Sequence, residues 1–293
     1  MSKTIPPLDL MFLLTETADS PKHVSALMTF EAPAAGARKL VSELVSACRA
    51  AQAVAPFTYV AEFPLTGAPR WTAAASVDLV RHVHHLALPA LAGDEALLEV
   101  VQRLHETTMD RSRPGFEMFF IEGLAGGGFA LFVRLHHAIV DGASAMSLLL
   151  GSLNDAAADQ RIQPFFAVEL AAPRARPPKR LLERMSALQK TARTQTAALA
   201  GLSLGLVKKG LGRLLGSTEP GSEPFSAPRT VLNERLRTPR SVATLSLSLA
   251  EMKAAGKAFG GTLNDVAVTV VDAGVQRYLA GLGQASAQPL VVM

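Results

Sequence analysis

Residues 129–153 constrain the fold of this chain most strongly, because they predict a strand, a turn and a helix in direct succession. Apolar side chains at 129, 131, 133 and 135 alternate with the side chains between them up to His136, and a period of two is typical of a β-strand. The pair Asp141-Gly142 predicts a turn, and residues 143–153 (ASAMSLLLGSL) predict a helix. The run His136-His137-Ala138-Ile139-Val140-Asp141-Gly142 therefore joins the strand to the helix.

The two adjacent histidines are the strongest candidates for chemistry. Strand alternation directs the side chains of His136 and His137 to opposite faces, so only one of them can face a given cavity. Neutral imidazole, with a usual pKa of about 6.5, can accept a proton from a hydroxyl group and return it to a leaving group. Together with Asp141 and Gly142, these histidines favour a functional cluster over the alternative of a purely structural polar cluster.

The rest of the first 170 residues predicts alternating strands and helices. We expect a strand at 23–30, helices at 38–51 and 94–108, and two strands joined by a hairpin turn at Gly126-Gly127-Gly128. This pattern predicts an α/β domain built of α+β layers. Trp71 is expected in its core.

Two proline-rich stretches divide the chain. The first stretch holds Pro173, Pro177 and Pro178, and the second holds Pro220, Pro224 and Pro228. The segment between these two stretches is a separate part of the chain. The predicted limits are therefore 1–170 for the first domain, 171–228 for a linker and 229–293 for the start of another domain. In the last part we expect a strand at 241–249 and helices at 250–259 and 263–282, with Asn264 as the N-cap of the second helix.

The linker is basic and amphipathic. Residues 174–213 hold ten Lys or Arg and one acid, Glu183, and apolar residues recur there at helical spacing. Such a helix can lie on an anionic membrane or a lipid droplet, or it can pack its apolar stripe on the protein. Nucleic acid is a poorer partner, because the segment has no aromatic residue to stack on bases.

Composition favours an intracellular protein. A hydrophobic content of 49% is enough to fill a core, and the single cysteine, Cys48, excludes an internal disulfide. The N-terminus lacks a secretory signal, and no apolar run reaches the about 18 residues of a membrane span. We therefore expect a cytoplasmic location, with peripheral attachment to a membrane through the basic helix.

Two other motifs carry less weight. Gly201-Leu202-Ser203-Leu204-Gly205 matches a nucleophile elbow, but every histidine lies at or before position 137, whereas that fold needs its histidine after the serine. His82, His84 and His85 have no cysteine or carboxylate at ligand spacing, so a histidine-bearing strand is expected there and no metal site.

The motif HHxxxDG is the signature of acyltransferases with the chloramphenicol acetyltransferase-like fold. Further blocks resemble the bacterial wax ester synthase/diacylglycerol acyltransferase family in the same order over nearly the whole chain: Pro7-Leu8-Asp9, Met11-Phe12-Leu13, His23-Val24, Asp78, Arg81-His82-Val83, Leu88-Pro89, Asp110-Arg111, Arg113-Pro114, Ile121-Glu122-Gly123-Leu124, Thr262-Leu263-Asn264-Asp265-Val266 and Arg277-Tyr278-Leu279. Two features depart from this pattern. Pro114-Gly115-Phe116 replaces the usual Pro-Leu-Trp, and the sequence stops at Met293, where family members continue into a second domain.

The resemblance implies a CoA-dependent acyltransferase fold with a complete N-terminal domain and the beginning of a second, similar domain. The implied reaction transfers a long-chain acyl group from acyl-CoA, a co-substrate, to a fatty alcohol or diacylglycerol, without a bound cofactor. The alternatives are an HHxxxDG acyltransferase with another acceptor and a catalytically inactive lipid-surface protein. A second copy or a complementary chain could complete the fold.

The resemblance also assigns roles to residues. It implies that His137 is the general base and that His136 is a structural member of the site. Asp141 would hold the loop through an ion pair with Arg134, Arg113 or a residue beyond Met293. Gly142 would support the motif, and the Asn264-Asp265 turn would approach a channel between two domains, although a plain helix cap and salt bridge explains that turn equally well.

Overall fold

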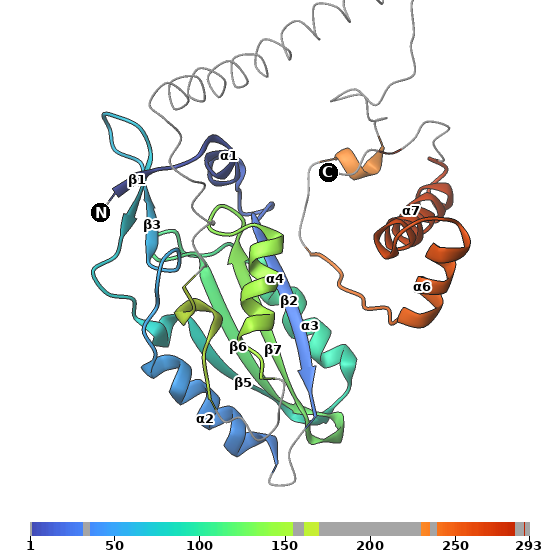
Figure 1. Cartoon of the computed structure of the whole chain (residues 1–293), viewed down its shortest axis with the longest axis horizontal. Coiled ribbons are helices and arrows are strands. Elements are labelled where there is room, and N and C mark those ends of the chain that lie inside the picture. The colour runs from blue at the N-terminus through green and yellow to red at the C-terminus, as the bar shows by residue number, and fades with distance from the viewer. Residues whose placement is uncertain are drawn as a thin grey trace, which may run out of the picture. The chain divides into compact units, whose positions relative to one another are not determined.

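The computed structural model describes residues 2–31, 36–154, 161–169, 230–234, 239–284 and 290. Its strands form a four-stranded sheet in the order β2-β7-β6-β5 and a three-stranded sheet in the order β1-β4-β3 (Figure 1). In chain order, the strands and α-helices are β1 (Ser2–Thr4), α1 (Pro7–Thr15), β2 (His23–Phe30), α2 (Ala37–Ala50), β3 (Tyr59–Glu62), β4 (Arg70–Ala73), β5 (Val83–Ala92), α3 (Asp94–Glu106), β6 (Phe116–Leu124), β7 (Phe129–His136), α4 (Gly142–Gly151), α6 (Leu249–Ala258) and α7 (Leu263–Gly281).

Strand β7 is the central strand that leads to the histidines. It pairs antiparallel with β2 on one side and with β6 on the other, while β6 pairs parallel with β5. All eight residues of β7 are buried, as expected for a strand with neighbours on both edges and packed layers on both faces. The predicted strand ending at His136 is confirmed, and so are the strand at 23–30 and the helices at 38–51, 94–108 and 143–153, within two residues at each boundary.

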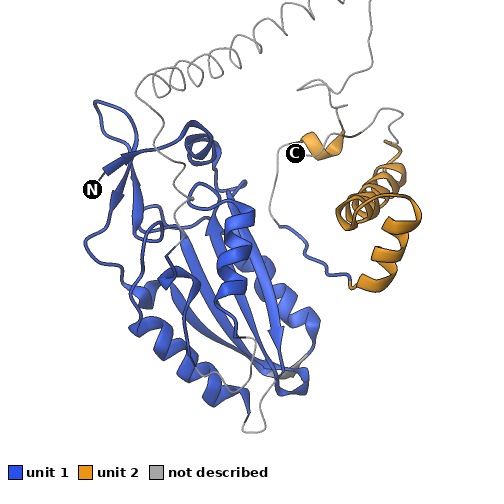
Figure 2. Cartoon of the chain, viewed as in Figure 1, with its two compact units in different colours: residues 1–170, 235–245 blue, residues 171–234, 246–293 orange. Residues whose placement is uncertain are grey.

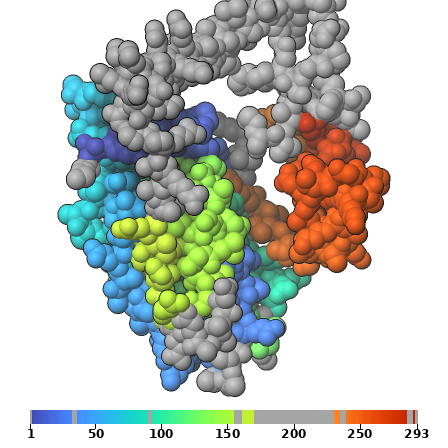
Figure 3. All heavy atoms as spheres, viewed as in Figure 1, coloured from blue at the N-terminus to red at the C-terminus, as the bar shows by residue number. Residues whose placement is uncertain are grey.

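Alternation along β7 sorts its side chains into two cores. Leu131, Val133 and Leu135 join the core that also contains buried residues of α2 and α4. Ala130 and Phe132 join a second core with residues of α3. Figure 3 shows α4 and residues 161–169 on the viewed face of this part of the chain. Each fully buried large side chain contributes about 1.5–3 kcal/mol, so the two cores hold the end of β7 firmly.

The connection between β6 and β7 is a tight hairpin with glycine-specific geometry. Gly126 and Gly127 have φ values of 80° and 77°, in the left-handed region that L-residues rarely adopt. A Cβ on Gly128 would lie 2.4 Å from the carbonyl oxygen of Phe30. The predicted glycine turn is thus confirmed, and its glycines are needed for the turn and for close packing against β2.

The small sheet and α1 pack against the loop that follows β7. Ile5, Leu13, Trp71 and Ala138 form one buried cluster, and Trp71 is 6% exposed. The prediction that Trp71 is a core residue is confirmed. Because Ala138 belongs to this cluster, α1 is joined to the segment that carries the two histidines.

The chain divides into two compact units, shown in Figure 2. Unit 1 comprises residues 1–170 and 235–245, and unit 2 comprises residues 171–234 and 246–293. Within unit 2, α6 and α7 confirm the predicted helices at 250–259 and 263–282. The basic segment at 174–213 and the Gly201–Gly205 motif lie outside the described residues.

The strand predicted at 241–249 is wrong. Residues 241–248 have no strand pairing, and α6 begins at Leu249. Alternation makes a strand only where a neighbouring strand supplies backbone partners, and no described strand does so here. Instead, the Arg240 N–H donates to Glu106 Oε1, and Val242 packs against the core beneath α3.

None of the helices in the described part of the chain combines the length and the hydrophobicity needed to cross a membrane.

Candidate active site

His137 is the first residue after β7, and its ring is held from one side. Its backbone N–H donates to the Lys22 carbonyl oxygen at 2.9 Å. The imidazole stacks on the Phe12 ring, with centroids 4.1 Å apart and an interplanar angle of 20°. The side chain is partly buried, and neither ring nitrogen has a hydrogen-bond partner among the described residues. The ring is therefore fixed by stacking, while both nitrogens retain their capacity for proton transfer.

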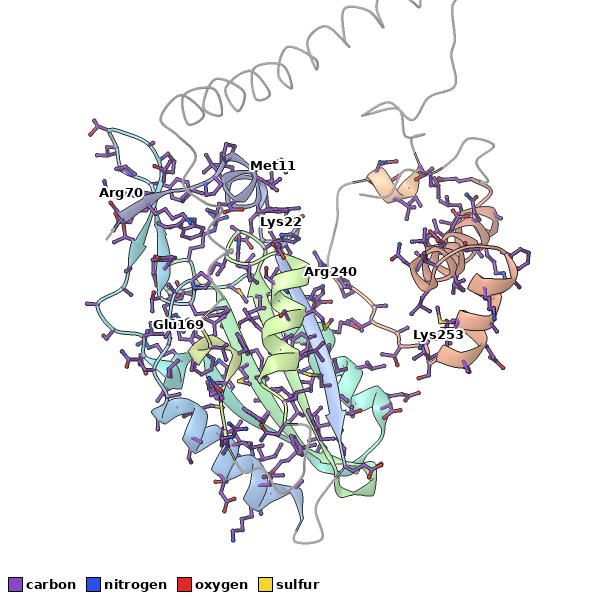
Figure 4. All side chains as sticks on the ribbon, viewed as in Figure 1. Met11, Lys22, Arg70, Glu169, Arg240 and Lys253 are labelled. Atoms are coloured by element: carbon purple, nitrogen blue, oxygen red, sulfur yellow. The ribbon has the colours of Figure 1, made fainter. Side chains whose placement is uncertain are left out.

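Helix α1 supplies two residues beside His137 that were not predicted as site residues. Phe12 and Asp9 are three residues apart and therefore share one helix face. Burial raises the pKa of Asp9, and the charges of Lys3 and His137 act against this rise. On the outer face, Met11 is 49% exposed and is labelled in Figure 4. Helix α1 is apolar on nearly every side, so its sequence held no pattern that would have assigned Phe12 and Asp9 to the inner face.

His136 is buried, and of its two ring nitrogens only Nδ1 has a hydrogen-bond partner among the described residues. Its Nδ1 accepts a hydrogen bond from the Ala138 N–H at 3.1 Å. Because Nδ1 is the acceptor, the proton of the neutral ring is on Nε2. That nitrogen lies 3.6 Å from Glu16 Oε2, slightly beyond ordinary hydrogen-bond length. His136 therefore connects the loop to Glu16, as expected for a structural member of the site.

Glu16 follows α1 and is an ionised carboxylate inside the protein. Its Oε1 accepts from the Lys22 N–H at 3.0 Å, and its Oε2 accepts from Arg111 Nε at 2.9 Å. Burial alone would raise the pKa of Glu16, but the contacts with His136, Lys22 and Arg111 outweigh it and lower the pKa to about 2. Sequence reasoning missed Glu16, because it lies outside every motif and its partners are distant in the chain.

Asp141 is the N-cap of α4. Its carboxylate accepts from the Ser144 N–H at 2.7 Å, and this bond lowers the pKa of Asp141. The predicted ion pair with Arg134 or Arg113 is wrong. Arg134 pairs with Glu117, the residue directly opposite it on β6, and Arg113 pairs with Asp110 at 2.9 Å. Each arginine therefore pairs with a carboxylate other than Asp141. Among the described residues, Asp141 supports the loop through the helix cap.

Gly142 is not the turn-forming residue that the sequence suggested. It is the first residue of α4, because the extended Asp141 already ends the loop. Its φ lies outside the left-handed region, and an added Cβ would meet nothing within 4 Å. The backbone at this position accepts other residues, so the fold alone does not require a glycine here.

The Pro114-Gly115-Phe116 departure affects packing next to His136. A Cβ on Gly115 would lie 2.7 Å from the Cβ of His136, so the leucine usual in the related sequences does not fit without movement. Phe116 is fully buried and stacks on His82, with centroids 4.3 Å apart. Its ring is therefore a core residue.

The Asn264-Asp265 turn lies in unit 2 and is a helix cap. The N-cap of α7 is Thr262, so the prediction that Asn264 is the cap is wrong. Thr262 and Asp265 form a reciprocal capping box, in which Asp265 Oδ2 accepts from the Thr262 N–H at 2.6 Å. The Thr262 contacts lower the pKa of Asp265. A threonine three residues before an aspartate satisfies the helix terminus better than Asn264 does. The predicted approach of this turn to the histidines stays a prediction.

The histidines at 82–85 have separate surroundings. His84 and His85 lie on β5, as predicted for a histidine-bearing strand, and His82 precedes it. His82 contacts the Phe116 carbonyl oxygen at 2.7 Å, and His84 stacks on Phe119. In the part of the chain that the structure describes, no three His, Cys, Asp or Glu side chains gather in a group that could hold a metal ion.

Comparison with known proteins settles the family. The model of the wax ester synthase/diacylglycerol acyltransferase catalytic domain matches residues 5–267. The chain belongs to the wax ester synthase/diacylglycerol acyltransferase family. A probable diacylglycerol O-acyltransferase of Mycobacterium tuberculosis, Tgs4, is 31% identical over 295 residues, which cover 98% of this chain and 62% of Tgs4. Another from the same species, tgs2, is also 31% identical, and the match covers 98% of this chain and 62% of the relative.

A solved structure confirms the α/β acyltransferase fold of this member of the wax ester synthase/diacylglycerol acyltransferase family. The wax ester synthase/diacylglycerol acyltransferase from Marinobacter aquaeolei VT8 superposes with a TM-score of 0.72 at 27% identity, over 99% of this chain and 64% of that one. The chain thus spans a little over three-fifths of the length of these relatives. Three of the family-like sequence blocks, at residues 7–13, 110–111 and 136–142, come together at the loop after β7. Glu16, at the end of α1, contacts Arg111 and lies beside His136.

Proposed function

We propose that this chain takes part in an O-acyl transfer from a long-chain acyl-CoA to a fatty alcohol or diacylglycerol, giving a wax ester or triacylglycerol. His137 is the general base in this proposal. The observation that carries it is the contrast between neighbouring rings: the His136 side chain is buried and its Nδ1 accepts from the Ala138 N–H, whereas the His137 side chain is only partly buried and neither of its ring nitrogens has a hydrogen-bond partner among the described residues. Family membership supplies the reaction class.

The proposed step needs no covalent enzyme intermediate. The alcohol oxygen attacks the thioester carbonyl carbon while its proton moves to a ring nitrogen of His137. The carbon–sulfur bond then breaks, and the proton returns from the imidazolium to the departing CoA thiolate. Asp9 and Asp141 lie close enough to His137 for their charges to interact with it. General-base assistance of this kind is typically worth about 10²- to 10⁴-fold in rate.

The identity of the acceptor and the association with a lipid surface are more specific parts of this proposal. The names of the relatives Tgs4 and tgs2 support diacylglycerol as the acceptor. The basic amphipathic segment at 174–213 supports peripheral association with a membrane or lipid droplet, on sequence grounds alone. A second copy or a complementary chain stays a prediction. Asn264, Asp265 and Gly142 stay predicted supporting residues of the site.

Thiol release tests the proposal. Purified protein is given a long-chain acyl-CoA with diacylglycerol, with a fatty alcohol or with a more polar alcohol, and free CoA is measured with ester product. His137→Ala should lower kcat by about 10²- to 10⁴-fold with an unchanged melting temperature. Asp141→Asn, which retains a capping oxygen, should have a much smaller effect.

Each arm of this assay distinguishes one alternative. Turnover only with the polar alcohol would replace the lipid acceptor by another one. Binding to vesicles without thiol release in any arm would indicate a catalytically inactive lipid-surface protein. Full activity of a folded His137→Ala variant would exclude His137 as the base.

A further inference from the structure

The backbone around His137 is tied down on both sides, and both ties lead to one side chain. Upstream, the His137 N–H donates to the Lys22 carbonyl oxygen at 2.9 Å, and the Lys22 N–H donates to Glu16 Oε1 at 3.0 Å. Downstream, the Ala138 N–H donates to His136 Nδ1 at 3.1 Å, and His136 Nε2 lies 3.6 Å from Glu16 Oε2. Glu16 closes a ring of contacts that encloses the peptide groups of His137.

We propose that Glu16 is a positioning residue for His137: its carboxylate holds the backbone on either side of that histidine, and so fixes where the imidazole lies for proton transfer. This inference rests on the proposed role of His137 as the base. Glu16 acts on the reaction only through His137, and it makes no contact with the substrates in this proposal.

The chemistry of its neighbours explains why a carboxylate is needed. Two N–H donors bind the Glu16 carboxylate, those of Lys22 and of Arg111 Nε, and the Nε2–H of His136 faces it at 3.6 Å. A carboxylate offers acceptors only, whereas an amide in either orientation would turn an N–H group toward one of these donors. The Glu16 side chain is 4% exposed, so water cannot replace a lost contact at low cost.

Glu16 also fixes the partner on which the His137 ring stacks. Arg111 binds Glu16 Oε2 and donates to the Leu13 carbonyl oxygen, so it joins Glu16 to the end of α1. Phe12, the residue before Leu13, stacks on the His137 ring. The backbone and the ring of His137 are thus held through the same carboxylate, and small displacements of catalytic groups of about 1 Å can cost about 10²-fold in rate.

The test is Glu16→Gln, which keeps the size of the side chain and removes its charge. We expect kcat in the thiol-release assay to fall about 10- to 100-fold, while KM for acyl-CoA stays within about twofold. Glu16→Asp, which keeps the charge on a shorter arm, should restore part of the rate. The matched control is Glu62→Gln, because Glu62 also pairs with an arginine, Arg70, at 3.0 Å but is exposed. It should leave kcat unchanged.

A double variant separates positioning from other roles. In a His137→Ala background, Glu16→Gln should cause no further loss, because Glu16 acts only through that imidazole. An additional loss there, or an unchanged kcat in folded Glu16→Gln protein, would overturn the inference. Should Glu16→Gln not fold, Arg111→Gln takes its place, with the same fall in kcat expected and an unchanged kcat overturning it. Full activity of His137→Ala would instead remove the proposed function.

Discussion

Residues 136–141, here called the histidine loop, and the Asn264-Asp265 turn both lead into a helix, yet they are held by opposite kinds of contact. At the histidine loop, Arg111 and Glu16 are 95 residues apart in the chain, and the carboxylate that they share as an ion pair lies 3.6 Å from His136 Nε2. At the turn, the capping contacts join Thr262 and Asp265, three residues apart. The loop is therefore held by segments that are distant in the chain, whereas the turn is stabilised by its own residues.

This difference bears on function as well as on stability. A catalytic base must keep its position while substrates bind and leave, and buried contacts from several elements provide that rigidity. The exposed capping box of α7 satisfies a helix terminus through residues three apart in the chain. Among the described residues, the histidine loop thus has the construction expected of a reaction centre, and the turn has that of a structural cap.

The first prediction is that mild acid weakens the histidine loop before it affects the turn. His23 lies directly opposite His136 in the sheet, and burial, with the nearby charges of Arg134 and His105, lowers its pKa to about 3. Unfolding restores a pKa of about 6.5, so the unfolded chain binds more protons below that pH. Stability should therefore be fully present above pH 6.5 and fall by about 2 kcal/mol by pH 5 from this group alone.

Denaturant unfolding at several pH values checks this prediction. His23→Gln should flatten the decline between pH 6.5 and 5, although His105, whose pKa is also lowered by burial, leaves part of it. Asp265→Asn is the control, because the lowered pKa of Asp265 places its titration below this window. If Asp265→Asn flattened the decline in the free energy of unfolding between pH 6.5 and 5 to the same extent, the contrast between the two regions would be contradicted.

The second prediction concerns the stacking partner of the base. Phe12→Ala should lower kcat about 10-fold, since a stacked pair contributes about 0.5–1.5 kcal/mol beyond its buried area. Met11→Ala is the matched control, because Met11 precedes Phe12 in α1 but lies on the exposed face. The measurement is thiol release at saturating acyl-CoA, with melting curves for both variants. Equal losses in the two variants would mean that α1 acts through its stability and not through the ring contact.

The sequence predicted most of what depends on local pattern. Period-two alternation identified the strand before His136, and turn chemistry identified the hairpin at Gly126. The same rules failed at 241–249, where alternation exists without a neighbouring strand. They could not reveal Glu16, because its role comes from Arg111 and His136, which only the folded sheet brings to it. The family resemblance indicated that residues 7–13 and 110–111 matter, and the structure supplies the physical reason.

The smallest effect is expected at the turn, where stability and activity can be separated. Thr262→Ala removes the N-cap and should lower the free energy of unfolding of α7 by about 1 kcal/mol, as measured by denaturant unfolding. Asn264→Ala should change stability little, because Asn264 makes no side-chain hydrogen bond within the described residues. If the contrast between the regions holds, neither variant alters kcat once the protein is folded. A folded Asn264→Ala variant with kcat lowered about 10-fold, at unchanged stability, would place this turn in the reaction centre after all.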